Sequence, residues 1–303
     1  AFTAEHNIAI GHEAGKSVTS GTNNVIIGHQ AGDAMTTAGF HVFVGAYAGG
    51  SLTTSGLGAV GVGYNAYGAT TTHGRGTAIG AYALQSVNHT QDDYNVAVGY
   101  RAGYNGVTIL KNTYVGSFSG YENLGQLNTF VGYYSGRYAS SGSNNTFIGN
   151  EAGLGTSAAP YSSGGSNTAV GYQALRNFTT GYLNVAMGYQ AAKNTTTGQN
   201  NIAIGTDALV SNTTSTGMIA IGYRALYNAS TASSHQIAIG WQALQNHTGS
   251  ADDYALAIGF EAGLNSQTDI GAVMIGYRAG YRSSGFSGVY IGSQAGLDST
   301  NSG

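Results

Sequence analysis

The sequence predicts an all-β fold, a parallel β-solenoid of about 17 coils with a ~17-residue repeat. Three observations lead to this prediction. One short segment recurs along nearly all of the 303 residues, each copy has the pattern of a β-strand, and the composition disfavours helices. Only 8% of the residues are charged, 50 are Gly and one is Pro, so the helix formers Glu, Lys and Arg are scarce.

The repeat is clearest in NIAIGHEAG (7–15), NTAVGYQAL (167–175) and NIAIGTDAL (201–209). Copies aligned on the glycine after the apolar triplet are 16 to 19 residues apart, except for one spacing of 22. Such regular spacing predicts one structural coil for each copy. The aligned glycines are Gly11, Gly28, Gly45, Gly63, Gly80, Gly99, Gly116, Gly132, Gly149, Gly171, Gly188, Gly205, Gly222, Gly240, Gly259, Gly276 and Gly292.

The residues before this glycine predict a strand. The positions one and three before it hold Ile, Val or Thr in almost every copy, which is a period-2 signal. The residue between them is also apolar: it is Ala in nine copies and larger in most others, such as Phe43 and Tyr114. We therefore expect both faces of the strand to be covered, with the β-branched pair facing one way and the middle residue against a neighbour.

The coil length predicts the rest of the architecture. At ~3.3 Å per strand residue a coil holds two short strands and two turns, and its interior has little room beyond the β-branched pair and a small residue. Coils stacked ~4.8 Å apart give a rod of very roughly 80 Å. One chain would leave much apolar surface uncovered, so we expect three chains around a central axis.

The repeat register predicts a single repeat domain over 1–303, with coils centred on Gly11 to Gly292. A loop insertion at 150–166 contains Pro160, and the register resumes after it. The enlarged turns in 88–100 and 246–260 share an Asp-Asp-Tyr ending and are expected to project. Their carboxylates favour solvated turns over a Ca²⁺ site, because two carboxylates are not a full ligand set; these residues are Asp92, Asp93, Asp252 and Asp253.

Composition excludes several function classes. Net charge is −3 without a basic tract, so no nucleic-acid partner is expected. No apolar run reaches the ~18–20 residues of a membrane helix, so no membrane insertion is expected. The chain has no Cys, and the opening AFTAEH indicates a processed product or a fragment. A chain rich in Asn, Thr and Gly and poor in charge fits an extracellular, cell-surface or virion-surface location.

No pattern for catalysis is present. The sequence lacks a G-x-S-x-G elbow, and the glycine run at 58–64 lacks the Lys and the helix of a phosphate loop. We therefore expect no enzyme, no catalytic residue and no cofactor. His12 and His29 occupy one repeat position in adjacent coils, where a surface ladder is favoured over a metal site.

The unit N-[IVT]-A-[IV]-G-x-x-[AS] resembles the YadA-like head repeat of trimeric autotransporter adhesins, and NTAVGYQAL is also similar to repeats of phage and viral tail fibres. The resemblance covers residues 7–296, although the repeat here is longer than the adhesin repeat of about fourteen residues. It implies a trimeric, left-handed parallel β-roll that displays an adhesive surface.

Aromatic residues recur just after the glycine and predict a surface ladder. Such a ladder stabilises a parallel stack or binds flat sugar rings, and the structural role is favoured. Next to it, Arg224 follows Asp207 and Arg278 follows Glu261 by one coil, so opposite charges should pair. The ladder candidates in the second half are Tyr172, Tyr189, Tyr223, Trp241, Phe260 and Tyr277, preceded by Tyr64, Tyr100 and Tyr133.

The polar turns hold seven N-x-[ST] sequons, which a glycan could occupy if the chain enters a secretory pathway. The sequon residues are Asn88, Asn144, Asn177, Asn194, Asn212, Asn228 and Asn246.

Together these features predict a non-enzymatic structural or adhesive fibre protein, a tail-fibre or adhesin-head segment that attaches multivalently to a surface. Its expected partners are itself, as a homotrimer, and a cell-surface glycan or another surface receptor. The alternative is a subunit of a self-assembling extracellular filament that stacks end to end. A flat binder of ice or crystalline polysaccharide is less favoured, because Thr clusters in variable turns.

Overall fold

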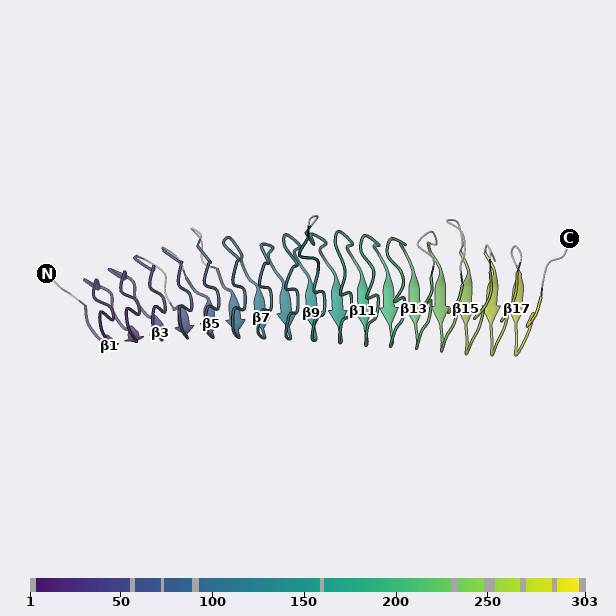
Figure 1. The fold of residues 1–303 in the computed structure, drawn as a ribbon, viewed down its shortest axis with the longest axis horizontal. Helices are drawn as coiled ribbons and strands as arrows, with labels where there is room; N and C mark the ends of the chain where they lie inside the picture. Colours follow the sequence, from purple (N-terminus) through teal and green to yellow (C-terminus); the bar gives the residue numbers. More distant parts are fainter. Residues whose placement is uncertain are drawn as a thin grey trace. The chain divides into compact units, whose positions relative to one another are not determined.

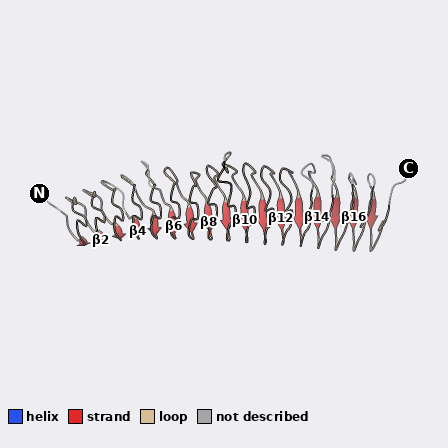
Figure 2. Cartoon of the chain, in the orientation of Figure 1, coloured by secondary structure: helices blue, strands red, loops and turns tan. Residues whose placement is uncertain are grey.

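The computed structural model describes residues 4–54, 58–71, 74–88, 93–158, 161–229, 234–247, 254–267, 271–284 and 288–299. They belong to two compact units, residues 1–145 and 146–303. The described residues contain strands and turns but no helix (Figure 2). The prediction of one domain over 1–303 stays a prediction.

Each unit is a stack of parallel three-residue strands that follow one another in chain order (Figure 1). Neighbouring strands within a unit pair in register, so that Ile202, Ala203 and Ile204 lie beside Ile219, Ala220 and Ile221. This arrangement confirms the predicted parallel β-solenoid with a ~17-residue repeat. The strands of the first unit are β1 (Ile8–Ile10), β2 (Val25–Ile27), β3 (Val42–Val44), β4 (Val60–Val62), β5 (Thr77–Ile79), β6 (Val96–Val98), β7 (Thr113–Val115) and β8 (Thr129–Val131). Those of the second are β9 (Thr146–Ile148), β10 (Thr168–Val170), β11 (Val185–Met187), β12 (Ile202–Ile204), β13 (Ile219–Ile221), β14 (Ile237–Ile239), β15 (Leu256–Ile258), β16 (Val273–Ile275) and β17 (Val289–Ile291).

The expectation of two strands per coil is wrong, because the described residues of each coil form one strand and otherwise turns. The second residue after the glycine takes a positive φ in coil after coil, for example Gln30 (50°) and Gln190 (53°). A left-handed residue interrupts an extended segment, so no second strand forms there. The turns still hydrogen-bond from coil to coil, as when the Thr36 N–H donates to the Thr53 carbonyl at 2.8 Å.

The strand faces are also opposite to the prediction. The middle residue of the triplet points into the coil: Ala203 and Phe43 are both fully buried. The β-branched pair lies on the outside, where Ile204 is 36% exposed and Ile79 is 40% exposed. The coil interior is therefore larger than predicted, since it accepts Phe and Tyr as well as Ala.

Two positions of the repeat share the interior of the coil: the middle strand residue and the fourth residue after the glycine. Where the middle strand residue is large, the fourth residue after the glycine is Gly: a Cβ on Gly49 would lie 2.5 Å from Phe43 Cε2. In most coils whose middle residue is small, the fourth residue fills the space, as Leu175 does opposite Ala169. Where both are small, as in the coil of Ala97 and Gly103, side chains of the neighbouring coils reach in: a Cβ on Gly103 would lie 2.8 Å from Leu84 Cδ2. The interior is thus filled by different residues in different coils, as close packing requires.

An Asn stands just before nine of the strands, and these side chains form a ladder of hydrogen bonds between coils. Asn184 accepts a hydrogen bond from the Asn201 N–H at 3.1 Å and donates to the Gly198 carbonyl at 2.9 Å. The side chain thus bonds backbone groups of the next coil that would otherwise be buried without a partner. This explains why Asn recurs four residues before the repeat glycine.

The predicted insertion at 150–166 is shorter in the structure. Gly155 donates its N–H to the Arg176 carbonyl at 2.9 Å, so the stack continues that far. The Thr156 N–H donates to Ser162 Oγ at 2.9 Å, and Ser162 Oγ donates to the Phe178 carbonyl at 2.7 Å. The extra residues therefore lie between 156 and 162, and β9 and β10 pair in register around them. Pro160 lies outside the described residues.

Candidate binding surfaces

The outer strand face is an uncharged apolar surface in each unit. The first and third residues of all seventeen strands are Val, Ile, Thr, Leu or Met. Several are well exposed, including Ile148 at 40% and Met187 at 41%. A parallel sheet usually has both faces covered, so this face is unusual for a single chain.

The predicted aromatic ladder is present in the second unit. Tyr172 and Tyr189 stack with ring centroids 5.2 Å apart and are 42% and 49% exposed. After a break at Thr206 the stack resumes with Tyr223 and Trp241, whose centroids are 4.2 Å apart. It continues to Phe260 at 6.5 Å and to Tyr277 at a further 5.6 Å.

In the first unit the rings alternate between two repeat positions. Tyr64 and Tyr100 stand first after their glycines, whereas Tyr47, Tyr82 and Phe118 stand second. They form one line with centroid distances of 5.2 to 6.2 Å, mostly edge to face. Sequence reasoning missed the second-position rings. The available signal was that Ala46, Ala81 and Ser117 are small where the next residue is aromatic.

Arginines lie among these rings, and they differ between the units. In the second unit Arg224 Nε lies 3.4 Å from Asp207 Oδ2, and Arg278 Nε lies 2.6 Å from Glu261 Oε2, which confirms the predicted pairs. In the first unit Arg101 and Arg137 lie over aromatic rings, and neither makes an ion pair with any residue that the structure describes.

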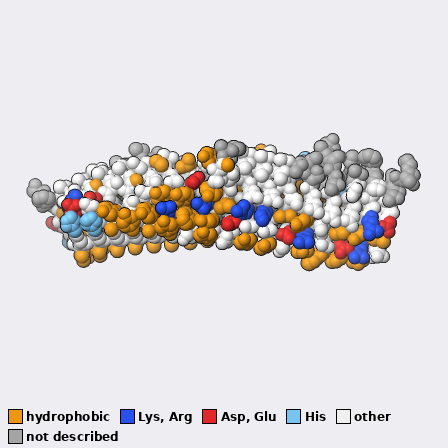
Figure 3. All heavy atoms as spheres, viewed as in Figure 1, with side chains coloured by type: hydrophobic (Ala, Val, Ile, Leu, Met, Phe, Trp, Pro, Cys, Tyr) orange, Lys and Arg blue, Asp and Glu red, His pale blue; other side chains and the backbone are white. Residues whose placement is uncertain are grey.

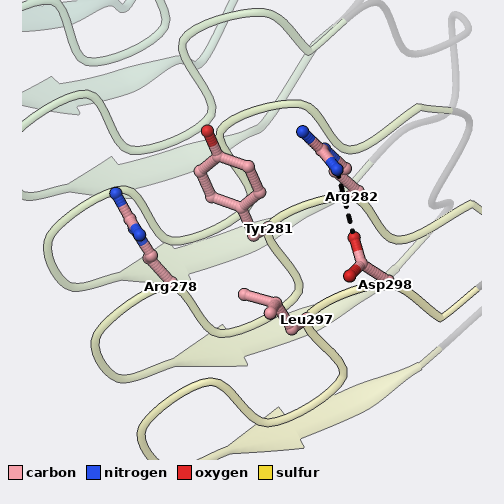
Figure 4. Close-up of a pocket in the computed structure, with 5 residues that line it drawn as sticks. All are labelled: Arg278, Tyr281, Arg282, Leu297 and Asp298. Carbon is pink, nitrogen blue, oxygen red and sulfur yellow. Dashed lines mark ion pairs between the residues drawn. The ribbon is translucent and has the colours of Figure 1, made fainter.

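A small pocket of about 230 Å³ lies in the second unit (Figure 4). Arg278 and Arg282 stand on either side of Tyr281, with Leu297 and Asp298 opposite (Figure 4). Arg282 Nη1 lies 3.6 Å from Asp298 Oδ1, and Arg278 is held by Glu261. Because both cations already have carboxylate partners, the pocket offers no free positive charge to a ligand.

Asp93 does not project, contrary to the prediction for the Asp-Asp turns. Its side chain is fully buried, with Oδ1 3.2 Å from the Asn95 N–H and Oδ2 accepting from the Tyr67 hydroxyl. It fills space that Gly76 leaves, where a Cβ would lie 2.7 Å from Asp93 Oδ1. Burial and the neighbouring Asp93 raise the pKa of Tyr67. Asp92, Asp252 and Asp253 lie outside the described residues.

The sequons fall into three environments. Asn88, Asn144 and Asn228 are exposed. Asn177 and Asn194 are half-buried and bonded to each other at 2.8 Å, and half-buried Asn246 bonds Asn228. Asn212 is fully buried and accepts from the Ser215 N–H at 2.9 Å, so a glycan there is sterically excluded and that prediction is wrong.

His12 and His29 stack with ring centroids 5.2 Å apart, as expected for a ladder position. Within the described ranges no three His, Cys, Asp or Glu side chains gather closely enough to hold a metal ion. The same residues include no helix that could cross a membrane.

Comparison with known proteins gave no match: no protein-family model, no curated protein and no solved structure is similar to this chain.

Proposed function

We propose that the chain is a non-enzymatic structural and adhesive fibre protein, a segment of an adhesin head or tail fibre outside the cell or on a virion. One observation carries the proposal, the uncharged outer face of the strands. It repeats in every coil, and an apolar face of this extent marks an association site.

The occupant of that face is a second and third copy of the same chain. The two outward-facing residues of one strand expose on the order of 100 Å² of apolar surface, so a unit with eight or nine coils presents on the order of 800 Å². This is the area that each partner buries in a protein–protein interface of standard size. Identical chains present the same two apolar ladders at the same spacing, so their faces match without charge complementarity. The homotrimer, and the left-handed coil, are taken from the resemblance to YadA-like head repeats.

With the strand faces joined, the aromatic ladders and the polar turns remain available for attachment. Each coil repeats the same positions, and three chains multiply them, so weak contacts to a surface receptor add up to strong attachment. An end-to-end filament remains the alternative. Electron microscopy separates the two, because the proposal expects particles of one length and the alternative expects continuous filaments.

The mass in solution tests the association. Light scattering of the purified chain should give three times the chain mass of 30.8 kDa. Ile202→Lys combined with Ile204→Lys puts charges on the outer face and should yield folded monomers. Thr197→Lys adds a charge at an exposed turn and should leave the trimer intact. A monomeric unmodified chain, or a trimer that survives both face substitutions, contradicts the proposal.

A further inference from the structure

We propose that the aromatic side of the first unit binds an acidic, unbranched polysaccharide through Arg101 and Arg137, an inference that rests on the proposed attachment function. The surface, called here the cationic aromatic strip, consists of Tyr82, Tyr100, Arg101, Tyr104, Phe118, Tyr121, Tyr133, Tyr134, Arg137 and Tyr138.

Each arginine of the strip is surrounded by ring faces. The guanidinium carbon of Arg101 lies 5.2 Å from the centroid of Tyr100, 5.2 Å from Tyr104 and 5.4 Å from Tyr82. That of Arg137 lies 4.3 Å from Tyr134, 4.8 Å from Tyr138, 5.2 Å from Phe118 and 5.6 Å from Tyr121. The rings fix the two cations in place without neutralising their charge.

The charge of the strip is what specifies the ligand. Arg224 occupies the same repeat position as Arg101 and also lies over two tyrosines, yet Asp207 of the preceding coil pairs with it. The residue in that place before Arg101 is Tyr82, so this repeat position offers Arg101 no carboxylate. The Nε atoms of Arg101 and Arg137 are buried and make no hydrogen bond. Glu122 of the preceding coil donates its N–H to the Arg137 carbonyl at 2.9 Å but makes no ion pair with the Arg137 guanidinium. Among the described residues neither cation thus has a carboxylate partner, and a carboxylate or sulfate group is their complement.

The spacing favours a polymer over a small anion. Arg101 and Arg137 belong to coils whose glycines are Gly99 and Gly132, two steps apart in the stack. At ~4.8 Å per step the cations are about 10 Å apart along the stack. A linear chain with one acidic group per sugar or per disaccharide can meet both, whereas a single anion meets one.

The exposed rings supply the other half of the site. Tyr100 and Tyr133 are 40% and 45% exposed, and the ring line continues through Phe118 and Tyr134 with a centroid distance of 5.3 Å. Figure 3 shows this side as a continuous band of hydrophobic side chains with basic groups set within it. The apolar faces of pyranose rings stack on such aromatic surfaces.

Calorimetry tests the proposal with an octamer of galacturonic acid and with the same octamer fully methyl-esterified, which keeps the sugars and removes the charge. The full chain should bind the acid at least about ten-fold more tightly than the ester, and raising the salt concentration should weaken binding. Arg101→Gln with Arg137→Gln should abolish that preference. Arg224→Gln, the matched change in the second unit, should leave it unchanged, with circular dichroism as the check on folding.

Equal binding of acid and ester, or an acid preference that survives both Arg substitutions, overturns the inference. So does the absence of binding in a chain that still forms trimers by light scattering, a result that leaves the proposed fibre function standing. A monomeric chain that binds the acid with the expected preference supports the inference while contradicting the fibre proposal.

Discussion

Gly188 shows why one residue type recurs at the end of every strand. Its φ is +135°, a conformation that is nearly exclusive to Gly. A Cβ there would also lie 2.6 Å from the carbonyl oxygen of Gly205 in the next coil. Gly292 has a similar φ of +126°, but a Cβ there meets nothing within 4 Å. Substitutions at these two glycines therefore separate the cost of backbone strain from the cost of a clash with the next coil.

Gly188→Ala should lower the free energy of unfolding by about 3–5 kcal/mol, because strain and a backbone clash act together. Gly292→Ala should cost about 1–2 kcal/mol, since strain acts alone. Urea denaturation of both variants measures the difference. Equal losses would mean that the distance between coils contributes nothing to the requirement for Gly.

The second prediction at the scale of single residues concerns the pKa of the Glu13 carboxyl. The Gln30 amide and the Lys16 ammonium donate to Glu13 Oε2 at 2.6 and 2.9 Å and lower the pKa of Glu13 from 4.5 to about 2. A carboxyl whose pKa is lower in the folded state stabilises the fold above the unfolded pKa, and that contribution is lost as pH falls through about 2.

Carboxyl-carbon NMR titration should therefore show Glu13 ionised down to about pH 2. Gln30→Ala removes the main donor and should move the pKa of Glu13 upward, toward its ordinary value. Gln190→Ala changes the same repeat position in another coil and is the control, which should leave the pKa of Glu13 unchanged. A pKa that does not respond to Gln30→Ala would contradict the assigned cause.

At the scale of one coil, the core is set by a pair of positions. Phe43 is buried opposite Gly49, whereas Ala169 is buried opposite Leu175. Gly49 and Leu175 have similar left-handed φ values of 61° and 51°, so the backbone at this position accepts either residue. A coil can therefore exchange one packing for the other.

Phe43→Ala alone should cost about 3–5 kcal/mol because it leaves a cavity. Gly49→Leu alone should also destabilise the unit, because its Cβ would contact the Phe43 ring. The double variant should recover at least half of the summed loss, which a double-mutant cycle measures by denaturation. Additive losses would show that the two positions do not share one volume.

For the whole molecule, the proposed association should be nearly independent of salt concentration, whereas binding of the proposed ligand should weaken as salt rises. The outer strand face carries no charged residue, so its association rests on apolar burial. The dissociation constant of the trimer should change by less than about three-fold between 0.05 and 1 M NaCl. Sedimentation velocity across that range tests this, with binding of the galacturonic acid octamer in the same buffers as the charge-dependent control. Dissociation of the trimer at high salt would contradict an apolar interface.

The sequence by itself determined the strands, their parallel order and register, the repeat glycine and the pairs Asp207–Arg224 and Glu261–Arg278. These follow from repetition: residues at equal positions of successive coils become neighbours, so spacing alone brings them together. The exposed ladder of the second unit was predictable for the same reason.

Only the tertiary structure decided which side of the strand faces inward. A period-2 pattern with apolar residues on both sides has no inherent direction. The left-handed residue two positions after the repeat glycine, such as Gln30 or Gln190, is not a glycine, so the sequence does not mark that turn. The burial of Asp93 and Asn212 escaped prediction because their partners, Tyr67 and Ser215, are set by local packing. The alternating rings of the first unit escaped it because neither repeat position is aromatic throughout, and only the folded coil places both on one line.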